Sequence, residues 1–153
     1  MTDLRLDYDA DLQGADLVIA NGLLQLDAGL RTAVLISLFS DARANESDEL
    51  PANDGDRRGW WGDSFSEIDG DRIGSRLWLL SRSKQTDGTL ELARGYSRDA
   101  LAWMLDDGIA SSVDVDASWH AIGILRLDIA LTPAIAGAAS QRFTVFWDAS
   151  YAL

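Results

Sequence analysis

The sequence predicts an α+β fold in which a central buried helix and a second amphipathic helix pack on a C-terminal antiparallel sheet. Residues 30–42 and 87–107 carry apolar side chains at helical spacing. In the last third of the chain, apolar and polar residues instead alternate in three separate segments. Helices followed by a run of strands favour an α+β fold over a parallel α/β sheet.

Size and charge limit the function. The 153 residues suffice for one domain over 1–153 with its own core. The net charge of −12 disfavours nucleic acid and anionic membranes as partners. The absence of Cys excludes disulfides, a thiol nucleophile and Cys-type metal centres. The acidic N-terminus lacks an apolar signal-peptide core, so we expect a soluble protein made inside the cell.

The first 29 residues predict short strands. Leu4, Leu6 and Tyr8 alternate with charged residues, as in an edge strand. Two short apolar runs then flank Asn21-Gly22, a dipeptide typical of a type I′ hairpin. These features predict a small β-structure ahead of the first helix.

The first helix, 30–42, is apolar on nearly every side, which places it at the centre of the fold. Asp27 is its expected N-cap, and Ser40-Asp41 marks its exit. Further along, the apolar block within residues 73–82 fits either a helix or a buried strand, because periodicity does not distinguish the two.

The second helix, 87–107, has Thr86 as its expected N-cap and Gly108 at C′. Gly95 weakens it by about 1 kcal/mol relative to Ala, so any break is expected there. After it, residues 113–118, 125–131 and 143–148 alternate with period two. They predict an antiparallel sheet with one face on the helices.

Residues 43–74 form one long irregular stretch rich in Gly, Asp and Glu. A loop this long inside a small domain is usually functional or ordered by a partner. Its sharpest feature is the segment RRGWWGD, residues 57–63. Two arrangements are open for its tryptophans: one indole pins the loop while the other faces outward, or both pack beneath the loop.

The acidic residues of this stretch predict neither a metal site nor a cofactor site. The EF-hand spacing fails ahead of both Gly55 and Gly70. Glu67 with Asp63 or Asp71 fits the carboxyl pair of a glycosidase, which gives an alternative function as a muramidase-like hydrolase. His120 is expected to be structural or exposed, and no GxSxG, HExxH or phosphate-binding glycine loop is present.

Five blocks of sequence resemble one family. TAVLISLFSDARA, DELP, RRGWWGD, GSRLWLLSRSK and ALAWMLDDGIA occur in that order within residues 32–110, a span of about half the chain. The set resembles the small baseplate protein of Mu-like contractile-tailed phages and prophages. RRGWWGD followed by GSRLWLL is its most specific part.

The resemblance implies a non-enzymatic tail component, similar in role to the small wedge subunit of T4-like phages. Such a protein clamps larger baseplate wedge proteins, faces tube, sheath or spike-proximal proteins, is assembled in the host cytoplasm and ends in the virion. The Glu-Pro-Arg signature of the T4-like subunit is absent here. Burial of aromatic and Arg anchors supplies much of the energy in many interfaces. We therefore expect the partner-binding set to be Arg57, Arg58, Trp60, Trp61, Arg76 and Trp78.

Overall fold

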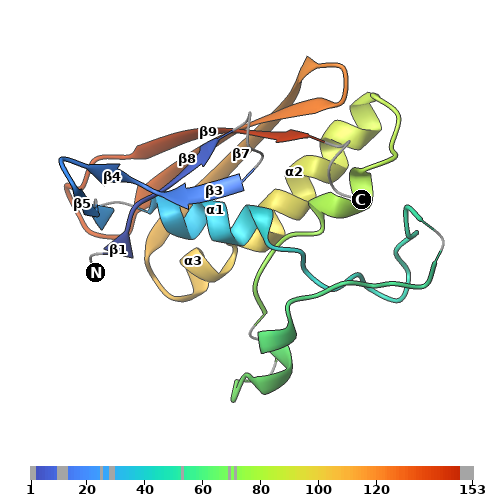
Figure 1. Cartoon of the computed structure of the whole chain (residues 1–153), viewed down its shortest axis with the longest axis horizontal. Helices are drawn as coiled ribbons and strands as arrows, with labels where there is room; N and C mark the ends of the chain where they lie inside the picture. Colours follow the sequence, from blue (N-terminus) through green and yellow to red (C-terminus); the bar gives the residue numbers. More distant parts are fainter. Residues whose placement is uncertain are drawn as a thin grey trace.

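A three-stranded antiparallel sheet forms one layer of the structure (Figure 1). The computed structural model describes residues 3–9, 14–24, 26–27, 30–52, 54–68, 70 and 72–148. The sheet has the strand order β7-β8-β9, and two hairpin connections join its strands. Its strands are β7 (Ala110–Ala121), β8 (Ile124–Pro133) and β9 (Gln141–Asp148).

The strand register aligns buried apolar residues of the three strands in rows across the inner face of this sheet. Leu127 lies between Ala117 of β7 and Val145 of β9, and all three are buried. The residues between these rows are more exposed and largely polar. The predicted alternation is therefore confirmed in all three strands.

The helices cover that inner face, which confirms the α+β fold (Figure 1). Helix α2 (Asp87–Leu101) packs on β7, and α1 (Arg31–Phe39) contacts α2 on one side and β2 (Leu6–Asp9) on the other. Val34 and Leu38 of α1 are at most 1% exposed, so this helix is central as predicted. Ile36, however, remains 38% exposed, and one side of α1 has no covering layer among the described residues.

The two ends of the second helical segment follow local sequence signals. Thr86 accepts a hydrogen bond from the backbone N–H of Thr89, which confirms it as N-cap. At the other end, Gly108 has φ +66°, and the N–H groups of Gly108 and Ile109 donate to Leu105 and Met104. This double hydrogen bond is a Schellman motif with Gly108 at C′.

Two details of the helices differ from expectation. Asp27 lies in β6 and does not cap α1, whose N-cap is Leu30 without a side-chain hydrogen bond. The second helical segment passes through Gly95 unbroken and is interrupted at Ala102, before the short helix α3 (Trp103–Asp106). Its tertiary packing on β7 outweighs the weak helix propensity of glycine.

The N-terminal strands form three small antiparallel pairs. Asn21 and Gly22 have φ of +54° and +75°, which confirms the predicted type I′ hairpin. Thr32 ties this region to α1, because its hydroxyl accepts from the N–H of Leu6 and donates to the carbonyl of Leu4. The pairs are β1 (Asp3–Leu4) with β6 (Leu26–Asp27), β2 (Leu6–Asp9) with β3 (Gly14–Leu17), and β4 (Ile19–Ala20) with β5 (Leu23–Leu24).

The apolar block within residues 73–82 is the short 3-10 helix η2 (Leu77–Leu80), and all four of its residues are buried. It closes the core beside α2 and follows directly on the long irregular stretch. Within the part of the chain that the structure describes, no helix is long and apolar enough to cross a bilayer.

Candidate functional site

Residues 43–74 leave the helices and sheet as a long lobe (Figure 1). Its two ends meet at a narrow neck, where Asp41 and Ser75 form a parallel β-bridge. The N–H of Ser75 donates to the carbonyl of Ser40, and the N–H of Ala42 donates to the carbonyl of Ser75, each at a distance of 2.9 Å. Inside the lobe, η1 (Trp61–Phe65) forms a 3-10 helix and much of the rest is irregular, as predicted.

The neck is built so closely that it requires particular residues. The buried Ser75 hydroxyl donates to the carbonyl of Leu38 over 2.6 Å. Gly74 has φ +101°, and a Cβ at this position would lie 2.5 Å from the carbonyl oxygen of Ser40. Only glycine fits a backbone that is both left-handed and this near its neighbour. The lobe therefore starts from a fixed base.

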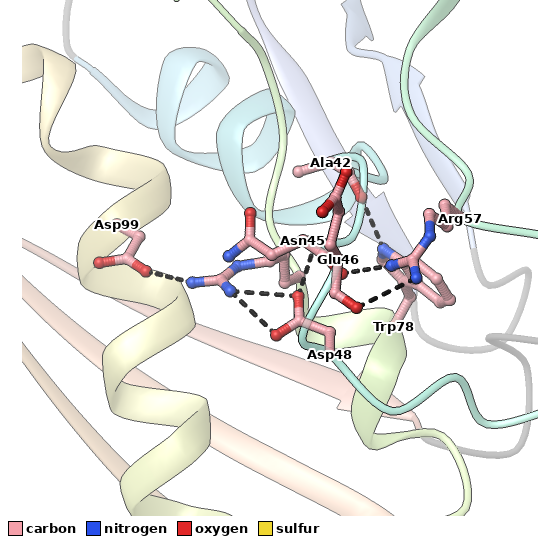
Figure 2. Close-up of polar contacts among 8 residues, drawn as sticks. Ala42, Asn45, Glu46, Asp48, Arg57, Trp78 and Asp99 are labelled. Atoms are coloured by element: carbon pink, nitrogen blue, oxygen red, sulfur yellow. Dashed lines mark hydrogen bonds and ion pairs between the residues drawn. The ribbon is translucent and has the colours of Figure 1, made fainter.

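Trp78 anchors the base from inside the protein. Its side chain is 3% exposed, and its indole N–H donates to the carbonyl of Ala42 over 2.8 Å (Figure 2). Ala44 and Leu79 pack with it in a small second core. The ring of Trp78, expected from the sequence to face a partner, is thus already enclosed by its own chain.

Arg57 holds together the two sides of the lobe. Its guanidinium donates to the carbonyl oxygens of Asn45 and Glu46 (Figure 2). Its own carbonyl accepts from the N–H of Ala44. These contacts join segments more than ten residues apart. Arg57 is thus an internal brace.

Arg76 fixes the lobe against α2. It forms ion pairs with Asp48 of the lobe over 3.2 Å and with Asp99 of α2 over 2.7 Å (Figure 2). Its guanidinium carbon lies over the Tyr96 ring, 4.7 Å from the ring centre. Burial disfavours the charged form, but the hydrogen bonds to Asp99 and Asp48 outweigh it, and the pKa of Arg76 is raised. Burial, reinforced by Asp48, also raises the pKa of the Tyr96 phenol.

Arg58 stands at the inner edge of the tryptophan pair. It forms an ion pair with Asp41 over 2.8 Å, and its guanidinium carbon lies 4.6 Å from the centre of the Trp78 ring. Its φ of +49° is unusual for a residue with a side chain. Its N–H donates to the Asp56 carboxylate over 2.8 Å, which supports this turn.

Trp60 and Trp61 both point outward, with 47% and 73% of their surfaces exposed. Neither arrangement expected from the sequence is therefore found. Their rings contact each other at 5.6 Å between centres, and Trp61 meets Phe65 edge-on at 5.9 Å. Phe65 is itself 75% exposed, so three aromatic side chains form one uncovered cluster.

Gly62 makes the position of Trp60 possible. A Cβ at Gly62 would lie 2.2 Å from the Trp60 ring, a distance that no side chain tolerates. The indole thus lies directly over the glycine backbone. The absence of a side chain at this position, directly after the tryptophan pair in RRGWWGD, therefore leaves the space that the Trp60 ring occupies.

A cleft of about 400 Å³ opens beside the tryptophans. Three of its lining residues are arginines, and one is an aspartate. Arg43 and Arg72 were not among the residues predicted from the sequence. No local motif connects them to RRGWWGD, and only the folding of the lobe brings them beside it. The lining residues are Arg43, Arg58, Gly59, Trp60, Trp61, Asp63, Ser64 and Arg72.

Of the carboxylates expected for a hydrolase, the two that the structure describes, Asp63 and Glu67, do not both line this cleft. Asp63 lines it and accepts a hydrogen bond from the N–H of Ile73, whereas Glu67 is exposed and is not among the lining residues. Asp69 and Asp71 lie outside the described residues. Among the residues described, no three His, Asp or Glu side chains come together as metal ligands.

An exposed aromatic cluster on a braced lobe is a feature typical of proteins that bind a neighbouring molecule through one surface. The family model described as phage protein GP46 matches residues 30–140. The chain therefore belongs to this family of Mu-like phage and prophage proteins, which confirms the resemblance found in the sequence.

Two relatives illustrate the family. The chain is 48% identical to "Baseplate protein gp46" of Escherichia phage Mu over 133 residues, covering 86% of this chain and 88% of the relative. It is 39% identical to "Mu-like prophage FluMu protein gp46" of Haemophilus influenzae over 147 residues, covering 96% and 98%. Both alignments span most of each protein, so the relationship extends well beyond the lobe.

Proposed function

We propose that the chain is a structural subunit of a contractile phage tail baseplate, and that its lobe clamps a larger wedge subunit during tail assembly in the host cytoplasm. The name of the phage Mu relative supports the baseplate role. The outward-facing pair Trp60 and Trp61 carries the clamping proposal, because these indoles lack a cover within the described residues.

The base of the lobe makes this surface ready to bind. Arg57, Arg76 and Trp78 hold it to the rest of the chain, so docking does not have to order the whole segment. A preformed surface loses less conformational entropy on binding than a disordered one. Of the six residues expected to contact a partner, Trp60 and Trp61 thus lie on the outside of the lobe, with Arg58 beside them. The other three, Arg57, Arg76 and Trp78, hold its base.

The test is co-purification with the adjacent larger wedge protein. Replacing both outer residues, Trp60→Ala and Trp61→Ala, removes two anchors worth about 2 kcal/mol each at a hot spot. Each anchor corresponds to about thirtyfold in affinity, so the double variant is expected to lose the complex. Its thermal unfolding should stay close to wild type because both rings are exposed.

A control removes apolar side chains elsewhere that are even more exposed than the two tryptophans. Ile122 and Ile135 are 94% and 77% exposed in the connections at the two ends of β8. The double variant Ile122→Ala, Ile135→Ala is expected to retain the complex. Retention of the complex by the tryptophan variant would contradict the clamping role.

A further inference from the structure

We propose that the cleft beside Trp60 and Trp61 receives a carboxylate side chain from an acidic segment of the docked wedge protein. This inference rests on the proposed function and specifies the partner's chemistry at the same surface. Its basis is the charge of the cleft wall, which differs in sign from the protein as a whole.

The cleft concentrates positive charge on an acidic protein. The whole chain has 13 Lys and Arg against 25 Asp and Glu, but the cleft has three Arg against one Asp. Arg58 is already paired with Asp41. Setting that pair aside, Arg43 and Arg72 still outnumber Asp63, so the wall keeps a positive excess.

Arg43 is positioned without being neutralised. No carboxylate among the described residues forms an ion pair with it, and its guanidinium donates only to the carbonyl of Arg58, over 3.4 Å. Gly59, with φ +112°, lets the backbone approach Arg43 closely, since a Cβ there would lie 3.0 Å from the Arg43 Cβ. RRGWWGD therefore places an available guanidinium beside the exposed indoles.

The chemistry of this wall favours a carboxylate on a protein segment. Guanidinium groups bind carboxylates through two parallel hydrogen bonds, and indole faces cover the adjoining apolar atoms of a peptide. A nucleic acid would bring a continuous row of negative charge against a chain of net charge −12. A single carboxylate avoids most of that repulsion because distant charges are screened within about 8 Å.

The main experiment measures the affinity of the wedge protein for charge-reversed variants. Arg43→Glu is expected to weaken the complex about tenfold or more, because a like charge then faces the incoming carboxylate. Arg43→Gln, which removes the charge without reversing it, is expected to show a smaller loss. Arg43 is preferred to Arg72 for this test because Arg72 directly follows Asp71 in the sequence, and the adjoining negative charge would complicate the effect of a charge reversal.

The control is the same charge reversal at Arg142, an exposed residue of β9 away from the lobe. Arg142→Glu is expected to change the affinity less than about twofold, the effect of net charge alone. If both reversals leave binding unchanged while Trp60→Ala, Trp61→Ala abolishes it, the acidic-segment inference is overturned and the clamping proposal stands. If the tryptophan variant also binds normally, both fail.

A second readout does not need the wedge protein. Capped peptides Leu-Glu-Leu-Glu and Leu-Gln-Leu-Gln differ only in charge, and a short single-stranded oligodeoxynucleotide serves as the alternative polyanion. The indole N–H resonances of Trp60 and Trp61 should shift with the acidic peptide and stay in place with the other two probes. A shift with the neutral peptide alone, or with the oligonucleotide alone, would overturn the inference.

Discussion

The tryptophan pair of RRGWWGD and the later Trp78 differ in role because their rings lie in different surroundings. Trp78 is buried and donates to Ala42, whereas Trp60 and Trp61 are exposed seventeen or more residues earlier. Composition alone treats them alike. The structure separates an anchor that stabilises the protein from side chains available to another molecule.

Trp78→Phe tests the anchor. The substitution keeps an aromatic ring but removes the N–H donor, so the partly buried carbonyl of Ala42 loses its partner. We expect the free energy of unfolding in urea to fall by about 1–3 kcal/mol. Trp61→Phe is the control and should change it by less than about 0.5 kcal/mol, because that ring is 73% exposed. Equal effects of the two substitutions would refute the assignment.

Residue signals that act over a few positions could be predicted from the sequence. Thr86 caps the helix it precedes, Asn21-Gly22 forms the hairpin turn, and Gly108 ends a helix. Each depends on backbone conformation within one turn. The roles of Arg57 and Arg76 could not be predicted, because their partners are brought near by the folded lobe.

At the scale of elements, the period-two strands were predictable because alternation directly reports one buried face. The interruption at Ala102 was not, since it depends on how α2 and α3 pack, and Gly95 was the stronger local signal. Asp27 was a plausible cap by type, but the chain places it in a strand ahead of the helix.

The edge strand β7 is capped by side chains of α2 and of the segment just before it. Arg94 donates to the carbonyl of Ala117 over 3.0 Å and also pairs with Asp116 and Glu91. Gln85 donates to the carbonyl of Ala121 over 3.0 Å. Such contacts occupy groups that would otherwise pair with another strand, which protects an edge from association.

Arg94→Met tests this cap. It keeps the apolar stem and removes every donor, so the carbonyl of Ala117 becomes free. We expect the free energy of unfolding to fall by about 1 kcal/mol, and sedimentation to show more self-association. Glu91→Gln, which weakens only the exposed pair, should cost less than about 0.5 kcal/mol. An unchanged Arg94→Met protein would show that the edge needs no cap.

On the scale of the whole molecule, a helix-and-sheet body presents a lobe whose base is fixed by its own chain (Figure 1). From the sequence, residues 43–74 were expected to be either functional or ordered by a partner. The neck at Asp41 and Ser75 and the brace at Arg57 instead order its base internally. Long-range contacts of this kind leave no periodic trace in the sequence.

The absence of cysteine allows the most direct test of the docking surface. Ser64 is exposed and lines the cleft, so Ser64→Cys places a single thiol there while both outer tryptophans remain. Its maleimide labelling rate would be measured in the free subunit, in assembled tail particles and in denatured particles. We expect rapid labelling in the free and denatured forms, and labelling at least about tenfold slower in the particle, where a neighbour covers the cleft. Equal labelling of the free subunit and the intact particle would contradict it.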